Sequence, residues 1–232
     1  MIADKKCKTC RRAGEKLFLR GDRCFTPKCA FERKAYPPGK RDSERKHRGT
    51  LTEFGAQLKE KQKIRNIYRV SERQFARYVK ESALKSSGNP AAGLYEELES
   101  RLDSAAYRAG FAKSRAEARQ AVSHGHITVN GRRVTVPSYR VRTGDVLAVR
   151  KASEGKEMFA KILGAGANSE GAATIPSEIG NGASMGIPSP LWIRRDAKAK
   201  TASIVGKPAI EGSDMAGTGG LNFKAVIEFY SR

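Results

Sequence analysis

The stretch that decides the fold is SRAEARQAVSHGHITVNGRRV, residues 114–134. It opens with Ser114 and has Glu117 three residues later, the capping-box pattern in which each side chain satisfies a free backbone amide. The pattern predicts a helix that starts here and ends before Gly125. We expect the free amides at the start of this helix, beside Arg115, to suit a phosphate group.

The second half of the same stretch predicts a β-hairpin. Asn130-Gly131 separates the apolar alternation of Ile127–Val129 from that of Arg132–Val136. Asn-Gly is a strong signal for a two-residue hairpin turn, because both central residues need a positive φ. A further strand is expected at Val146–Val149, after the turn at Thr143-Gly144-Asp145.

A helix is also expected just upstream, from about Tyr95 to Ala109. Leu98 and Leu102 lie on one face of it, and Gly110 follows where a left-handed C-terminal residue is expected. Together with the helix after Ser114 and the hairpin, it predicts a compact α-then-β unit.

The N-terminal part of the chain predicts helices. Leu51, Phe54 and Leu58 recur at helical spacing, with Thr52 at the N-cap. A second helix is expected from about Ser71. Both helices place Lys and Arg opposite their apolar residues, so we expect an apolar core inside and a cationic face outside.

The charge of the chain indicates a polyanionic partner. The net charge is +21, and residues 1–80 hold 24 of the 45 Lys and Arg residues against 9 Asp and Glu. Nucleic acid is favoured over a membrane surface because the apolar stripes are needed for a core.

The mean hydropathy is −0.56, and no apolar run approaches the ~20 residues that span a bilayer. With no secretory signal at its start, we expect a soluble, cytoplasmic protein.

The cysteines predict a metal knuckle. Cys7 and Cys10 form one close pair, Cys24 and Cys29 form another, and thirteen residues separate the pairs. This spacing can deliver four thiolates to one tetrahedral ion, and a set of four cysteines is typical of a structural site. Zinc is favoured, with an iron–sulfur cluster as the alternative. We expect the neighbouring Lys and Arg residues to lower the pKa of these thiols.

Two segments predict little regular structure. Tyr36-Pro37-Pro38-Gly39 is a turn, and the basic stretch Lys40–Arg48 after it is expected to be an extended arm that follows phosphates. Ala152–Pro190 contains Gly/Ala-rich runs without apolar periodicity. We expect an irregular insertion or linker there, with a short helix at about Ser153–Leu163.

These motifs resemble a known family. The run from Leu98 to Arg150 is similar to the small RNA-binding module named after ribosomal protein S-four, through Ser114-Arg-x-Glu-Ala-Arg, Val129-Asn-Gly-Arg-Arg and Gly144-Asp. Other motifs resemble the bacterial small-subunit ribosomal protein four family, in its cysteine-bearing branch: Cys10-Arg-Arg-x-Gly-x-Lys-Leu-Phe-Leu, Tyr36-Pro-Pro-Gly, Glu53-Phe-Gly-Ala-Gln-Leu-Lys, Glu72-Arg-Gln-Phe, Arg101-Leu-Asp and Ile227-Glu-Phe-Tyr-Ser-Arg. The resemblance covers the chain except for about residues 152–190.

The resemblance implies a structural protein of the small ribosomal subunit and not an enzyme. Members of the family bind small-subunit rRNA first, at a junction in its 5′ domain, and nucleate assembly of the subunit body. The implied partners are rRNA, neighbouring ribosomal proteins and mRNA near its entrance, without a membrane or a small-molecule substrate. Arg45, Lys46 and Arg48 match the residues near the mRNA entrance, although Lys40-Arg41-Asp42 stands where the family commonly has Gln-His-Gly.

The implied fold class is α+β. Residues 1–97, with about 191–232, would form a helical domain that carries the metal knuckle and is completed by C-terminal segments. Residues 98–151 would be the inserted module, two helices packed on a short antiparallel sheet, and residues 152–190 the insertion. The C-terminal residues expected to pack on the first domain are Trp192, Asp196, Pro208 and Ile227–Tyr230.

The candidate rRNA-binding residues are basic, apart from one helix-capping serine. In the N-terminal domain they are Arg11, Arg12, Lys16, Arg23, Lys28, Lys59, Lys61, Lys63, Arg65, Arg69, Arg73 and Arg77. In the module they are Arg108, Ser114, Arg115, Arg119, Arg132 and Arg133. We expect them to neutralise phosphates on a surface whose shape sets the specificity.

Two other classes of protein deserve comparison. An RNA-modifying enzyme can carry the same module, and Arg101-Leu102-Asp103 resembles the tripeptide around the catalytic aspartate of pseudouridine synthases. Asp103 falls inside a predicted helix, however, and the large catalytic domain is absent. A zinc-dependent DNA-binding regulator would need a recognition helix with finger spacing, which the sequence lacks.

Overall fold

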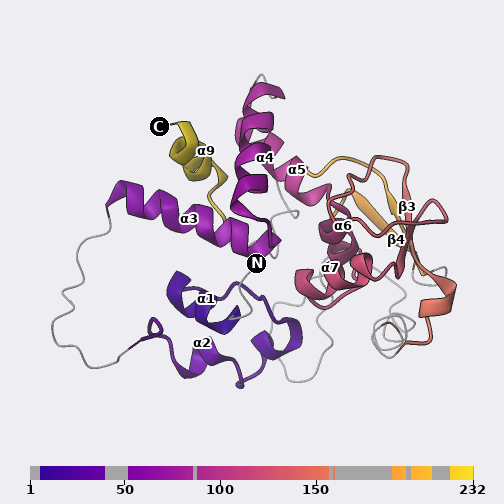
Figure 1. The fold of residues 1–232 in the computed structure, drawn as a ribbon, viewed down its shortest axis with the longest axis horizontal. Helices are drawn as coiled ribbons and strands as arrows, with labels where there is room; N and C mark the ends of the chain where they lie inside the picture. Colours follow the sequence, from indigo (N-terminus) through magenta and orange to yellow (C-terminus); the bar gives the residue numbers. More distant parts are fainter. Residues whose placement is uncertain are drawn as a thin grey trace. The chain divides into compact units, whose positions relative to one another are not determined.

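The computed structural model describes residues 6–39, 52–85, 88–156, 159, 190–196, 200–210 and 220–231. The chain forms two compact units (Figure 1). Unit 1 comprises Met1–Glu99, Lys113–Ala116 and Ala209–Arg232, and unit 2 comprises Ser100–Ala112 and Glu117–Pro208. Because the described residues combine helices with an antiparallel sheet, the predicted α+β class is confirmed.

Unit 1 is helical in the part that the structure describes. Thr52 begins the longest helix, as its side chain accepts a hydrogen bond from the Gly55 amide at 3.2 Å, which confirms the predicted N-cap. The elements are α1 (Lys6–Ala13), the 3-10 helix η1 (Gly21–Phe25), α2 (Ala30–Arg33), α3 (Glu53–Tyr68), α4 (Glu72–Lys85), α5 (Pro90–Glu99) and α9 (Phe223–Ser231).

Two apolar clusters hold unit 1 together. The larger one joins α3, α4, α5 and the C-terminal helix α9, with Ile64, Phe75, Leu94 and Val226 fully buried. Helix α9 packs against α3 and α5, so the end of the chain completes the helical core (Figure 1). The smaller cluster, under α1, is built from Cys10, Ala13 and Leu17, with Leu19, Phe31 and Ile67 packed against it.

The predicted helix from Tyr95 to Ala109 is wrong in one respect, because the structure has two helices there. Helix α5 ends at Glu99 and α6 (Leu102–Arg108) begins after Arg101, whose backbone is extended. The break is stabilised by hydrogen bonds to a distant segment: the Val141 amide donates to the Ser100 carbonyl, and the Leu102 amide donates to the Tyr139 carbonyl, both at 2.8 Å. These partners replace the helical hydrogen bonds that a continuous helix would make.

The described residues of unit 2 form one antiparallel sheet of five strands. The strand order is β2-β1-β3-β5-β4, and the strands are β1 (Ile127–Val129), β2 (Arg132–Arg133), β3 (Val146–Val149), β4 (Ile193–Asp196) and β5 (Thr201–Ile204). Asn130 and Gly131 both have positive φ, which confirms the predicted hairpin turn. Helix α7 (Arg115–Ser123) precedes β1, and Ala118 and Val122 from α7 lie in the same core as Ile127 and Leu147.

The expected course of residues 191–208 is wrong. Trp192 and Asp196 were expected to pack on the first domain, but Trp192 is buried in the core of unit 2 and Asp196 lies in β4 of its sheet. Pro208 also belongs to unit 2. The physical reason is that β5 pairs with β3, with Leu147 opposite Ala202, and thereby satisfies the backbone groups of an otherwise open strand edge. Residues 227–230 lie in α9 of unit 1.

Two predicted segments fall largely or wholly outside the described residues. They are the basic arm Lys40–Arg48 and nearly all of Ala152–Pro190, with its expected short helix. The described start of the latter forms a short 3-10 helix, η2 (Lys151–Ser153). Within the described ranges, none of the helices has the length and apolarity to cross a membrane.

Candidate RNA-binding surface and cysteine cluster

The hairpin of unit 2 exposes its two arginines. Arg132 and Arg133 form β2, and both side chains are exposed. Gly125 leaves room for the Arg133 side chain, because a Cβ atom at position 125 would lie 2.0 Å from Arg133 Nε. Gly125 also has a φ of +69°, which side chains other than glycine rarely adopt. The glycine at the end of α7 therefore positions a cation on the outer face of the hairpin.

The start of α7 differs from the phosphate site that the sequence predicted. Ser114 is buried, and the Arg115 guanidinium pairs with Glu99 at 2.8 Å. Glu99 is fully buried and also accepts a hydrogen bond from the Tyr68 hydroxyl at 2.7 Å. The guanidinium lies 4.4 Å from the centre of the Tyr68 ring. Arg115 is thus engaged in an internal network of unit 1.

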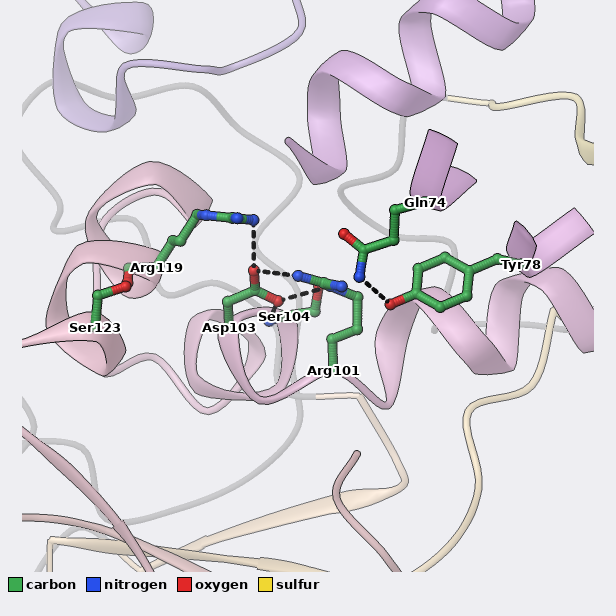
Figure 2. Close-up of polar contacts among 7 residues, drawn as sticks. All are labelled: Gln74, Tyr78, Arg101, Asp103, Ser104, Arg119 and Ser123. Atoms are coloured by element: carbon green, nitrogen blue, oxygen red, sulfur yellow. Dashed lines mark hydrogen bonds and ion pairs between the residues drawn. The ribbon is translucent and has the colours of Figure 1, made fainter. Parts of the chain in front are cut away.

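Asp103 is held in a buried ionic cluster of unit 2 (Figure 2). Arg101 donates to both of its carboxylate oxygens, at 3.0 Å from Nε and 2.9 Å from Nη2. Arg119 approaches the same carboxylate at 3.4 Å, and the Ser104 amide donates to it at 3.0 Å. The Asp103 carboxylate therefore neutralises Arg101 at the start of α6 and Arg119 on α7, which favours a structural role over a catalytic one.

Several other predicted contact residues are less exposed than expected. Arg108, on α6, is almost fully buried. Arg69 follows α3 and has a left-handed backbone. The Arg11 guanidinium donates hydrogen bonds to the carbonyls of Lys34 and Tyr36, and it lies over the Tyr36 ring. Lys16 is paired with Glu32.

The expectation that Lys61 and Lys63 lie on the outer face of α3 is wrong. Both are buried, and both bind carboxylates: Lys61 contacts Glu72 at 2.6 Å, and Lys63 contacts Glu15 at 2.7 Å and Glu60 at 2.6 Å. Burial alone lowers the pKa of Lys63, but its hydrogen bonds to the two glutamates outweigh this effect and raise the pKa. The carboxylates compensate the cost of burying the ammonium groups.

Glu72 is the centre of a second network on α3 and α4. It binds Lys61, accepts a hydrogen bond from the Tyr230 hydroxyl at 2.7 Å, and pairs with Arg65 at 2.9 Å. Burial raises the pKa of Glu72, but the hydrogen bonds from Lys61 and Tyr230 prevail and lower it. No local signal in the sequence predicts the contact between Glu72 and Tyr230, since 158 residues separate them.

The remaining predicted cations lie on the surface. Arg77 forms an ion pair with Glu81 at 3.2 Å along α4. The exposed candidates of unit 1 are Arg12, Arg23, Lys28, Lys59, Arg73 and Arg77. These cations on unit 1, and separately the hairpin arginines on unit 2, are exposed positive charge that a polyanion can contact.

The four cysteines come from three neighbouring elements. Cys7 and Cys10 lie on α1, Cys24 lies in η1, and Cys29 caps α2. All but Cys7 are buried. Burial raises the pKa of Cys10 and of Cys24, and the nearby thiols raise both further, so the expectation of lowered thiol pKa values is wrong for these two. Across the described residues, no three His, Cys, Asp or Glu side chains are arranged to hold a metal ion.

These features define a class of protein, an α+β RNA-binding protein with a basic hairpin in its sheet module. Family models match both parts of the chain. The "Ribosomal protein S4/S9 N-terminal domain" matches residues 2–99, and the "S4 domain" matches residues 100–147.

Relatives extend the match over nearly the whole chain. The small ribosomal subunit protein uS4 of Caldicellulosiruptor bescii is 43% identical over 226 residues, which is 97% of this chain and 96% of the relative. Those of Azoarcus sp. and Thermus thermophilus are each 44% identical and cover 99% and 97% of this chain, and 98% and 96% of the relatives. The chain therefore belongs to the small ribosomal subunit protein uS4 family. The predicted family is confirmed, and with it the prediction that the protein is not an enzyme.

Proposed function

We propose that this protein is a structural component of the small ribosomal subunit, located in the ribosome of the bacterial cytoplasm, and that it binds the subunit's rRNA. The observation that carries the proposal is the 43% identity to a small ribosomal subunit protein uS4 over 97% of the chain. The exposed Arg132 and Arg133 of the hairpin fit the same role. Their guanidinium groups are suited to phosphate oxygens.

The finer role follows the family resemblance. The protein would bind a junction in the 5′ domain of the rRNA and nucleate assembly of the subunit body beside neighbouring ribosomal proteins. Arg45, Lys46 and Arg48, which lie outside the described residues, would be near the mRNA entrance. The surplus of positive charge in residues 1–80 supports a large rRNA contact by this part of the chain.

Filter binding to purified small-subunit rRNA tests the proposal. We expect affinity to fall steeply with salt, with a slope of several units in a plot of log K against log salt concentration. An unrelated structured RNA of equal length is the control. Equal affinity for the two RNAs, or a flat salt dependence, would contradict the proposal.

We also propose that Cys7, Cys10, Cys24 and Cys29 hold one structural metal ion, with zinc favoured over an iron–sulfur cluster. The donor set fits zinc in kind, since the cysteines in α1, in η1 and directly before α2 number four, as many as a closed structural zinc site uses. Burial raises the pKa of Cys10, and the other three thiols lie close enough to raise it further. A cation would remove this mutual repulsion between thiolates, and it would link the three short elements.

Elemental analysis of the native protein tests the metal site. We expect one equivalent of zinc, and we expect Cys24→Ser to reduce the metal content and to loosen residues 6–39 in hydrogen exchange. The module should keep its exchange protection in this variant, which serves as the internal control. A native protein without stoichiometric zinc or iron would refute the site.

A further inference from the structure

Two phenylalanines of unit 1 stack on each other at the surface. The ring centres of Phe18 and Phe25 are 4.9 Å apart, and the ring planes differ by 22°. The exposed fractions of these residues are 38% and 46%. Their neighbours in the sequence behave differently, because Leu17 and Cys24 are buried. The chain thus turns two aromatic rings outward between residues that it turns inward.

The backbone at Phe18 is held in an unfavourable conformation. Its φ is +48°, in the left-handed region that bulky side chains rarely adopt. Residues in this region persist where the surrounding structure holds them, and they are frequent at functional sites. Leu17 and Leu19, on either side of Phe18, both pack in the smaller cluster of unit 1. The chain turns at Phe18 between these two inward leucines and leaves the Phe18 ring partly exposed.

Three cations lie close to Phe18 and Phe25 in the sequence. Arg20, Arg23 and Lys28 are exposed, and Arg23 lies in the same 3-10 turn as Phe25. The Thr26 hydroxyl donates to the Arg23 carbonyl at 3.1 Å and closes this turn. The acidic residue of the turn, Asp22, pairs with Lys113 at 2.6 Å, so its charge is balanced. The segment that carries the two rings therefore also carries exposed positive charge.

We propose that Phe18 and Phe25 form a stacking platform for an unpaired RNA base, while Arg20, Arg23 and Lys28 contact the flanking phosphates. Aromatic side chains beside cations are the combination that binds single-stranded nucleotides, since every base offers a π face and every nucleotide a phosphate. An apolar protein surface would use the rings but would leave three cations without a partner. The inference rests on the proposed function for the source of the base, which is small-subunit rRNA.

Substitutions at Phe25 test the platform. Phe25→Leu keeps an apolar side chain but removes the aromatic face, and Phe25→Tyr keeps the face. In filter binding to purified small-subunit rRNA, we expect Phe25→Leu and Phe25→Ala to weaken affinity by about 5- to 150-fold. Phe25→Tyr should stay within about twofold of the wild type. The slope of log K against log salt should not change, because stacking releases no counterion.

Phe54→Leu is the matched control. Phe54 is also exposed and also contacts a second phenylalanine, Phe229, with ring centres 5.3 Å apart, but it lies on α3. This variant should bind rRNA within about twofold of the wild type. Thermal unfolding followed by circular dichroism checks that all variants remain folded.

The outcomes separate this inference from the proposed function. Wild-type affinity for small-subunit rRNA that is no better than for an unrelated RNA of equal length would overturn the proposed function. If the wild type is selective and Phe25→Leu binds as tightly, the platform alone is overturned. Ultraviolet cross-linking of the wild-type complex provides a test without variants, since mass spectrometry should find a nucleotide attached to Phe18 or Phe25. Cross-links found only elsewhere in the chain would also refute the platform.

Discussion

Helix α3 and the β1–β2 hairpin are both rich in cations, but they use them in opposite ways. On α3, Lys61 and Lys63 are buried against glutamates. On the hairpin, Arg132 and Arg133 are exposed, and no ion pair with either is present among the described residues. Part of the positive charge of the helix is therefore neutralised within the protein, whereas that of the hairpin is available to a polyanion.

The difference shows that the number of basic residues in a segment does not measure its contact with RNA. Glu15 and Glu72 reach α3 from other elements of unit 1, and they turn predicted contact residues into parts of its core. A paired, buried cation contributes to stability, and an exposed one contributes to affinity and to its salt dependence. Variants that affect only one of these two quantities can test the comparison.

The largest effect is expected at the buried pair of Asp103 and Arg101. Asp103→Ala removes the carboxylate that binds Arg101, a residue with 2% of its surface exposed. We expect the free energy of unfolding to fall by about 3–5 kcal/mol, because the buried Arg101 guanidinium loses the carboxylate that binds it through two hydrogen bonds. Urea unfolding followed by circular dichroism measures this change.

Asp196→Ala, at an exposed position of β4, should stay within about 0.5 kcal/mol of the wild type. Equal stabilities for the two variants would contradict the structural role of Asp103.

The next effect concerns the hairpin. We expect the double variant Arg132→Ala/Arg133→Ala to bind small-subunit rRNA about 100-fold more weakly, since each charged hydrogen bond contributes about 1.5–3 kcal/mol. The salt slope should decrease by about one unit for each phosphate contact that is lost. Filter binding at several salt concentrations measures both quantities. The unfolding free energy is the control and should change little. Unaltered affinity would mean that the exposed arginines do not face the rRNA.

A smaller and opposite pattern is expected on α3. Lys63→Met keeps the alkyl chain but removes the ammonium group that binds Glu15 and Glu60. We expect the unfolding free energy to fall by about 1–2 kcal/mol, while the rRNA affinity changes less than about twofold. Lys59→Met, at an exposed position of the same helix, is the matched comparison. A loss of rRNA affinity in Lys63→Met similar to that of the hairpin variant would break the distinction between the two regions.

The smallest effect is a change in acid stability. Burial opposes the lowered pKa of Glu72, but its hydrogen bonds from Lys61 and Tyr230 hold the pKa below the ordinary value of 4.5. Its contribution is therefore complete above that value and is lost as pH falls through the lowered pKa. Glu72→Gln should reduce stability by about 1 kcal/mol or less at pH 7, because the carboxylate is partly exposed. In urea unfolding, the difference from the wild type should shrink as the pH falls through the lowered pKa of Glu72. A difference that grows with acidification would have the wrong sign.

Local chemistry in the sequence predicted much of the fold. The N-cap at Thr52 and the hairpin turn at Asn130-Gly131 were predicted because each depends on residues within a few positions. The strand Val146–Val149 was also predicted, with the boundaries that the structure has. The family was recognisable from motifs spread along the chain, and the relatives confirm it.

Contacts between distant residues account for the structural features that the sequence did not predict. The helix break before Leu102 depends on hydrogen bonds to Tyr139 and Val141, and the placement of Trp192 depends on the pairing of β5 with β3. In the candidate RNA-binding surface, the exposed hairpin could be located from its turn. The burial of Lys61 and Lys63 could not be predicted from the sequence, since the carboxylates that bind them come from other elements or from other turns.

By itself, the sequence determined the helix and hairpin signals, the family and the overall excess of positive charge. Those properties depend on residue types and short spacings, which a linear chain already contains. Only the tertiary structure decided which cations are neutralised inside the protein, which arginines reach the surface, and that Phe18 and Phe25 stack outward. The physical reason is that burial and pairing depend on groups brought together by folding, and the free energy of a charge depends on those neighbours.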